Sequence, residues 1–215
     1  MLKKNEQCLD EIIRERRSTR GFKEEYPQID EIKQIIRSGL LAPYAAQAVG
    51  VAKDYRKFFI IRKDSQTIQK MAALMKNEAE LKFEQLKSEI QKNPLMIQKG
   101  SPFLKKLEQV KNQGVLGVGT APYYIIVAEK RGTPPVEQQS LAHCLQNMWL
   151  KTTELGLGFH LVSMTTEMAK NKEFSELLNI SSQEYGINGC AIGYPKDDLP
   201  PKKTCNADEF IKELE

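Results

Sequence analysis

Three arginines and a serine form the group in this sequence that is best suited to chemistry. Residues 16–22, the arginine-rich stretch, read RRSTRGF. Arg16, Arg17 and Arg20 therefore lie within five residues, with Ser18 between them. Guanidinium groups present forked donors that match a phosphate or a flat, electron-rich ring. Apolar residues at helical spacing precede the stretch, which places these cations where a helix ends. The pattern indicates an anion site; the alternative is a solvated basic helix end that only complements the helix dipole.

Length and composition limit the classes of protein to which this chain can belong. The 215 residues are 40% hydrophobic and 28% charged, which is typical of a single globular domain over residues 1–215. Lys and Arg number 32 against 28 Asp and Glu, a surplus too small to indicate a nucleic-acid partner. No apolar run approaches a membrane span or a signal core, so we expect a cytoplasmic protein without a membrane partner. Four scattered cysteines without a CxxC pair indicate reduced thiols and no metal site.

Apolar periodicity predicts alternating helices and strands. Strands are expected at residues 57–62, 121–128, 157–163 and 187–192. Helices are expected near residues 9–13, 29–40, 65–90, 141–155 and 174–178. Four strands separated by helices predict a layered α/β or α+β domain.

Residues 81–119 interrupt this order with a predicted helical excursion. Its sequence combines a charged amphipathic helix with breaks at Pro94 and at Gly100-Ser101-Pro102, and a short helical piece follows around Phe103. The glycines at 114, 117 and 119 precede a strand, so they do not form a dinucleotide fingerprint, which must follow one. Four apolar residues could reach inward from the excursion: Phe83, Leu86, Phe103 and Leu104.

Other residues whose side chains could take part in catalysis or ligand binding have simpler explanations. Met148 and Trp149 fall in a helical stripe that predicts core packing. His143 and Cys144 are adjacent on the same helix and point about 100° apart, so they are badly placed to share a metal or to act as base and nucleophile. His160 is expected to be a core residue or a pocket wall. None of these residues is therefore singled out as a catalyst by its sequence context.

The order of short motifs resembles the nitroreductase-like flavoproteins. The motifs are RRSxRxF, then LAP, then APYYIIV, then a long helix ending in LGLG, then IGYP and a lysine pair. The resemblance implies an α+β fold with a central mixed, mostly antiparallel sheet flanked by helices. It also implies a homodimer that binds FMN at the subunit interface and passes electrons from NADH or NADPH to an acceptor.

The resemblance assigns roles to the basic residues. Arg16, Arg17 and Ser18 would hold the FMN phosphate and ribityl chain, and Lys202 or Lys203 would close the anion site.

Around the flavin ring, the resemblance places Arg20 at the N1 and C2 carbonyl edge, where reduction adds negative charge that a guanidinium stabilises. The backbone N–H groups of Ser163 and Met164 would face N5 and O4.

Another flavin contact in the family comes from the motif PSAxNxQP, which this chain replaces with PYAAQAVG from Pro43 onward. Contacts there would come from Pro43, Tyr44, Ala45 and the amide of Gln47. Because most of the motif's side chains differ, the substrate preference of a typical nitroreductase does not carry over.

The implied reaction is ping-pong, with a nitroaromatic, quinone, enone or second flavin as the acceptor. Residues 81–119 lie where the family has a cover over the flavin, so we expect this lid to shape substrate access; the alternative is a surface decoration. The apolar residues of the segment 208–214 are expected to dock on a partner subunit. Reductive dehalogenation, flavin breakdown on the same scaffold, or a non-enzymatic nucleotide-binding module are the other functions considered.

Overall fold

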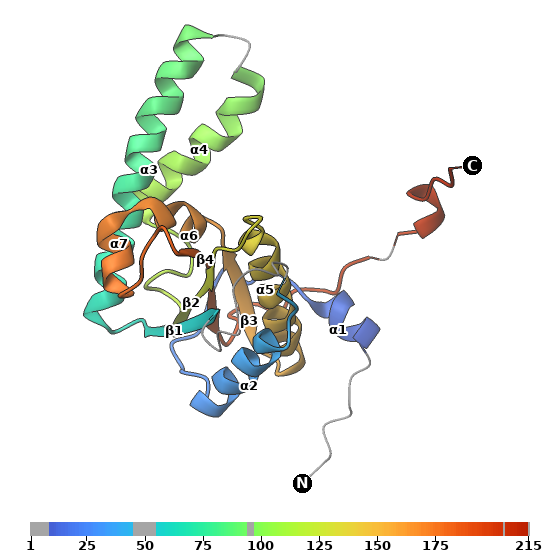
Figure 1. Ribbon diagram of the computed structural model, residues 1–215. Helices are drawn as coiled ribbons and strands as arrows, with labels where there is room; N and C mark the ends of the chain where they lie inside the picture. Colours follow the sequence, from blue (N-terminus) through green and yellow to red (C-terminus); the bar gives the residue numbers. More distant parts are fainter. Residues whose placement is uncertain (1–8, 45–54, 94–96, 204, 215) are drawn as a thin grey trace.

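An antiparallel sheet forms the centre of the molecule. The computed structural model describes residues 9–44, 55–93, 97–203 and 205–214. Four strands pair in the order β1-β2-β4-β3, and every neighbouring pair is antiparallel (Figure 1). They are β1 (Arg56–Arg62), β2 (Tyr123–Lys130), β3 (Gly158–Val162) and β4 (Tyr185–Gly193). The predicted α+β architecture and all four predicted strands are confirmed.

Helices cover both faces of the sheet because the central strands are apolar on both sides. On β2, Ile125 and Val127 pack against one layer, whereas Tyr124 and Ile126 pack against the other. The first layer consists of α2 (Ile29–Leu40) and α5 (Glu137–Glu154). The second consists of the start of α3 (Gln66–Lys92) with α6 (Met164–Glu167), η2 (Met168–Lys170) and α7 (Lys172–Leu177). Two cores therefore lie on opposite sides of one sheet.

Local signals set the ends of the helices in the first layer. Gln28 and Glu31 form a capping box after Pro27 at the start of α2. Helix α5 ends at Glu154, and Gly156 follows with a φ of 72°, a conformation that favours glycine. Helix α1 (Leu9–Glu15) precedes the arginine-rich stretch, as predicted, and η3 (Ala207–Glu209) lies near the C-terminus.

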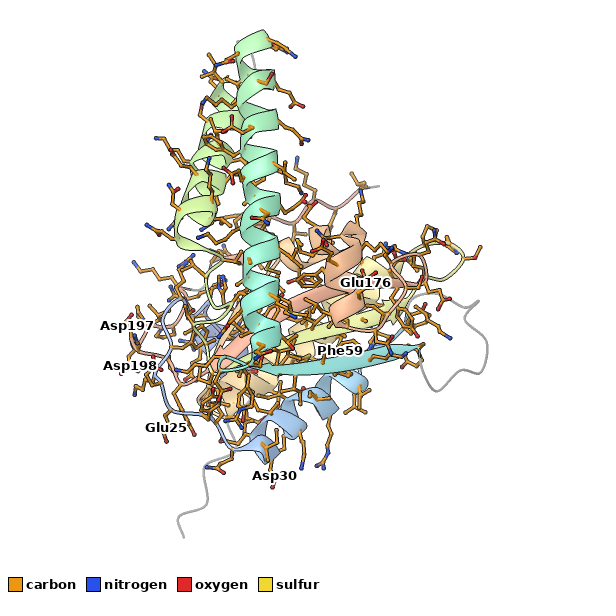
Figure 2. The ribbon with its side chains drawn as sticks, turned by 90° about the vertical axis from the view of Figure 1, so that its left-hand side faces the viewer. Glu25, Asp30, Phe59, Glu176, Asp197 and Asp198 are labelled. Atoms are coloured by element: carbon orange, nitrogen blue, oxygen red, sulfur yellow. The ribbon has the colours of Figure 1, made fainter. Side chains whose placement is uncertain are left out.

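The excursion is a long helical hairpin that stands out from the sheet layers. Its first helix, α3, begins after Ser65, whose side chain accepts the N–H of Ile68 at 3.2 Å. Figure 2 shows α3 passing close to the strand that carries Phe59 and continuing well beyond it. Residues of α3 that are buried end at Ala79, so the outer part of this α3–α4 hairpin packs mainly on itself.

The second helix of the hairpin corrects one prediction. Helix α4 (Ile97–Gln113) runs through Gly100 and Pro102, which the sequence analysis interpreted as breaks around a short helical piece. Gly100 instead lets the two helices approach, because a Cβ at this position would lie 2.8 Å from Cδ1 of Ile90. Packing between the helices outweighs the backbone bond that Pro102 cannot donate.

No described helix combines the length and the apolar character needed to span a bilayer. The described cysteines, Cys144, Cys190 and Cys205, are free thiols.

A buried ion pair ties the end of α2 to the sheet. Arg56 of β1 binds Glu129 of β2, and both side chains are almost completely buried. The same guanidinium donates to the carbonyl oxygens of Gly39 at 2.7 Å and Ala42 at 3.2 Å. Burial raises the pKa of Glu129 to about 7, although Arg56 opposes the shift. Arg56 thus satisfies the last carbonyls of α2 while it compensates a buried carboxylate.

Replacing Arg56 with methionine is expected to lower the free energy of unfolding by about 3–5 kcal/mol at a pH above the pKa of Glu129, because a buried carboxylate loses its partner. Denaturant unfolding monitored by circular dichroism measures the change. Arg62→Met is the control, because Arg62 ends the same strand in an exposed pair with Asp64. The double variant Arg56→Met/Glu129→Met should recover the part of the loss that comes from the unpaired carboxylate, whereas the carbonyls of Gly39 and Ala42 lack their donor in both variants. A double variant as unstable as Arg56→Met would contradict this explanation.

Candidate functional site

The arginine-rich stretch lies along the outer edge of β3. Ser18 forms a parallel bridge with Phe159, and the N–H of Thr19 donates to the carbonyl of Phe159 at 2.9 Å. Further along, Phe22 forms an antiparallel bridge with Pro195. The approach depends on Gly158, because a Cβ there would lie 2.7 Å from the side chain of Thr19. The stretch therefore has a fixed position against the sheet.

The side chains of the stretch contact different parts of the structure. Arg16 lies over the ring of Trp149 on α5, whereas Arg20 lines a cavity of about 370 Å³. Arg17 and Thr19 line a different hollow, and the guanidinium of Arg17 donates to the carbonyl of Pro200. The roles predicted for Arg16, Arg17 and Ser18 at the FMN phosphate and ribityl chain stay predictions.

Trp149 of α5 holds the arginine-rich stretch in place. Its ring stacks on Phe159 with the centroids 4.7 Å apart, and the guanidinium carbon of Arg16 lies 4.2 Å from its centroid. Its Nε1–H donates to the carbonyl of Arg17 at 3.2 Å. Sequence reasoning assigned Trp149 to core packing and missed this contact. The sequence did contain one indication of it, because the N–H of a buried tryptophan needs a hydrogen-bond acceptor.

The C-terminal lysine pair lies beside the same stretch. The N–H of Lys202 donates to the carbonyl of Arg14 at 3.0 Å, next to the contact between Arg17 and Pro200. The side chains of Lys202 and Lys203 are exposed. Two segments that are far apart in the sequence therefore meet at the start of the arginine-rich stretch.

The cavity that contains Arg20 is built from five parts of the chain. Its walls come from the arginine-rich stretch, α3 through Lys82, α4, the glycine-containing segment before β2, and the end of β3 with α6. Residues that supply its polar and apolar character include Arg20, Lys106, Leu107, His160, Ser163 and Met164. Gly117 has a φ of 85° and contacts the sheet so closely that a Cβ would lie 2.5 Å from that of Ala191. The segment before β2 therefore closes the cavity onto the sheet.

Ser163 and Met164, the flavin contacts that the resemblance implies at the end of β3, both belong to the cavity wall. Ser163 precedes the first turn of α6, and both residues line the cavity. N–H groups at the start of a helix have no partner within the helix. The end of β3 can therefore present backbone donors to a ligand.

His160 is the wall residue predicted from the sequence. Burial lowers its pKa below the usual value, and the positive charges of Arg20 and Lys106 lower it further. The imidazole is consequently neutral at pH 7. Its Nδ1 is buried and has no hydrogen-bond partner among the described residues. A ligand in the cavity could supply one.

Pro43 and Tyr44, two of the four flavin contacts expected after α2, do not line this cavity. The hydroxyl of Tyr44 donates to the carbonyl of Lys130 at 2.6 Å, and the carbonyl of Pro43 accepts from Arg56 at 3.4 Å. Neither residue lines the cavity. Ala45 and Gln47 lie outside the described residues. The flavin contacts predicted for these four positions stay predictions.

Helix α4 forms one wall of the cavity. Phe103 lines it, as expected, together with Leu107. Phe83 and Leu86 instead pack between α3 and α4, and the half-buried Leu104 does not reach the cavity. The expected effect of this wall on substrate access stays a prediction.

Solved structures of similar fold cover nearly the whole chain. A nitroreductase with bound FMN from Bacteroides fragilis has a TM-score of 0.67 and 17% identity, covering 97% of this chain and all of that one. A BluB-like flavoprotein from Clostridium difficile has a TM-score of 0.68 and 20% identity over 97% of this chain and all of that one. A putative NADH dehydrogenase/NAD(P)H nitroreductase from Parabacteroides distasonis has a TM-score of 0.58 and 19% identity, with coverage of 97% and 98%.

No curated protein sequence matches the chain significantly. The model of the Nitroreductase family, however, matches residues 13–194. This match begins just before the arginine-rich stretch and ends with β4, so it includes the sheet and every wall of the cavity. The chain belongs to the nitroreductase family.

Proposed function

We propose that this protein is an FMN-dependent oxidoreductase that passes electrons from NADH or NADPH to a small oxidised acceptor. The observation that carries the proposal is the fixed position of the arginine-rich stretch beside the cavity. Ser18 bridges to β3, and Arg20 lines the cavity. Such an arrangement suits a ligand with a phosphate at one end and a flat polar ring at the other.

The residues of the cavity fit a flavin. A flavin ring has flat apolar faces and a polar edge, and the cavity offers Leu107 and Met164 together with the donors of Arg20 and Ser163. The unpartnered Nδ1 of His160 is a further polar group that a ligand would satisfy. Beside it, Arg16 and the lysine pair provide positive charge for a phosphate.

The protein's part in the reaction is to position and to stabilise charge. FMN, when bound, supplies the hydride chemistry. Arg20 is suited to stabilise the negative charge that reduction adds at the ring edge, and the N–H groups of Ser163 and Met164 are suited to the opposite edge. Trp149 limits the motion of Arg16, which lowers the entropy lost on binding a phosphate. Donor and acceptor would use the same cavity in turn, which gives a ping-pong reaction.

Reduction of the purified protein by a nicotinamide nucleotide tests the proposal. We expect a yellow protein whose flavin absorbance bleaches when NADH or NADPH is added without air, and recovers when a nitroaromatic or quinone follows. Stopped-flow absorbance measures both half-reactions separately. A colourless protein that takes up no added FMN would instead favour a non-enzymatic module.

Removing the Arg16 guanidinium should weaken the binding of FMN more than the binding of riboflavin. Arg16→Ala is expected to cost about 1.5–3 kcal/mol of FMN affinity, the contribution of a charge-assisted hydrogen bond. The same variant should leave riboflavin affinity nearly unaltered, because riboflavin lacks the phosphate. Flavin fluorescence titration measures both, with Arg14→Ala on exposed α1 as the control. Equal losses for the two flavins would move the phosphate site elsewhere.

A homodimer would complete the site. Pro43 and Tyr44 lie outside the cavity of their own chain, so a second copy is the source that could bring this region to the flavin. The C-terminal segment leads away from the body (Figure 1), and Phe210 and Leu214 are 75% and 94% exposed. Such apolar side chains are better accommodated on a partner surface.

Light scattering on the FMN-loaded protein should give twice the chain mass of 24.5 kDa. Deleting residues 208–215 should weaken the dimer, because the exposed apolar side chains of the segment would no longer be buried on the partner. Dilution followed by analytical ultracentrifugation compares the two proteins. A full-length protein that stays at 24.5 kDa with flavin bound would refute the dimer.

A further inference from the structure

A buried threonine fixes the turn that follows β3. The hydroxyl of Thr165, the second residue of α6, donates to the carbonyl of Val162 at 2.6 Å. Val162 is the last residue of β3, and Ser163 connects it to the helix. The side chain of Ser163 forms no capping hydrogen bond, although serine is a common cap at this position. The turn is therefore held by the hydroxyl of Thr165 and not by its own serine.

A second buried hydroxyl extends this contact into the sheet. The hydroxyl oxygen of Tyr124 on β2 lies 2.6 Å from Oγ1 of Thr165. Thr165 has a single hydroxyl proton, and it gives this proton to the carbonyl of Val162, which has none to offer. Tyr124 is consequently the donor to Thr165. The three groups form one directed chain of hydrogen bonds, from an interior strand of the sheet to the end of β3.

The structure leaves room for this chain inside an apolar core. Tyr124 and Thr165 are 1% and 0% exposed. A Cβ at Gly189 would lie 2.8 Å from Oγ1 of Thr165 and 3.0 Å from the hydroxyl of Tyr124, so the glycine makes space for both. Burial raises the pKa of Tyr124, and its hydroxyl therefore stays protonated and remains a donor. A phenylalanine would fill the same core without a polar group that needs a partner. The hydroxyl of Tyr124 therefore has a use beyond packing.

The chain ends on a peptide group at the cavity wall. The carbonyl of Val162 and the N–H of Ser163 belong to the same planar, trans peptide group, so they point in opposite directions. A hydrogen bond that holds the carbonyl toward the buried Thr165 therefore holds the N–H away from the core. Val162 and Ser163 both line the cavity. The two hydroxyls can in this way set the direction of a donor that they do not contact.

We propose that Tyr124 and Thr165 are positioning residues that aim the N–H of Ser163 at the flavin through the carbonyl of Val162. The inference rests on the proposed function, in which this N–H serves the ring edge opposite Arg20. A preorganised donor stabilises developing charge without first reorganising, so its direction affects the rate of hydride transfer. Neither Tyr124 nor Thr165 lines the cavity, and both act through the backbone.

Two substitutions of Thr165 test the inference in the FMN-loaded protein. Thr165→Val removes the hydroxyl but keeps the shape of the side chain, whereas Thr165→Ser keeps the hydroxyl. Stopped-flow absorbance with NADH or NADPH should show a limiting rate of flavin reduction that is about tenfold lower or more in Thr165→Val, because a misdirected donor stabilises less charge. The nucleotide concentration that gives half of this rate should not change. Thr165→Ser should retain most of the rate.

A buried threonine elsewhere in the chain provides the matched control. Thr152 on α5 is fully buried, and its hydroxyl donates to the carbonyl of Met148 at 2.7 Å. Thr152→Val therefore loses the same kind of hydrogen bond at a position that does not line the cavity. This variant should reduce flavin at the rate of the unaltered protein.

A double variant separates positioning from stability. Thr165→Val leaves the hydroxyl of Tyr124 buried without its acceptor, which lowers the free energy of unfolding. Tyr124→Phe/Thr165→Val removes both hydroxyls and should recover the part of that loss that comes from the unpaired tyrosine. Flavin reduction should stay slow, because the carbonyl of Val162 still lacks its donor. A rate that recovers together with stability would overturn the inference, since the chain would then serve the fold alone.

Backbone dynamics of the FMN-free protein give a readout that is independent of activity. NMR relaxation of the backbone amides should show the order parameter of the Ser163 N–H falling from about 0.85, the value of rigid backbone, toward about 0.6 in Thr165→Val. Thr152→Val should leave it unaltered. An unaltered order parameter or an unaltered reduction rate in Thr165→Val would overturn the inference and leave the proposed function intact. An unsubstituted protein that binds no FMN would refute the proposed function itself.

Discussion

The absence of a side chain at Gly158 is the constraint on which the candidate site depends. Thr19 occupies the space that a Cβ at this position would need, with its atoms 2.7 Å from that point. Only this close approach lets the N–H of Thr19 reach the carbonyl of Phe159 and lets Ser18 bridge to the strand. A larger residue would push the arginine-rich stretch away from the sheet. The position of every cation in the stretch therefore follows from one glycine on β3.

Once the stretch is fixed, the rest of the fold supports it from two sides. Helix α5 brings Trp149 under Arg16, and the C-terminal segment brings the carbonyl of Pro200 to Arg17. The sheet supplies rigidity, because β3 is hydrogen-bonded to β4 along its full length. Functional groups held by a sheet edge and a core helix keep their geometry better than groups on a free loop. The sheet and the helices packed on it thus hold the charged stretch in a fixed geometry.

Sequence patterns predicted the fold because each main element depends on local signals. The apolar run of β2 and the stop at Gly156 are of this kind, and both match the structure. The prediction for α4 was wrong in part, because packing against α3 keeps the helix continuous through Pro102. That packing joins residues of two helices and cannot be seen in the local sequence. The pairing of Arg56 with Glu129 joins residues 73 positions apart and left no sequence signal. Within the site, the family resemblance supplied the candidate residues, and the structure brings Arg20, Ser163 and Met164 to one cavity.

The construction of the α3–α4 hairpin has a consequence for how such proteins can diversify. The buried residues of α3 end at Ala79, while Leu107 and Val110 near the end of α4 line the cavity. Whole helical turns could be added or removed at the outer end without opening either core, because those turns contact mainly each other. Substitutions on the inner face of α4 can likewise alter the cavity without touching the arginine-rich stretch. Selection can therefore change what the cavity accepts while the arginine-rich stretch and the stability of the sheet stay constant.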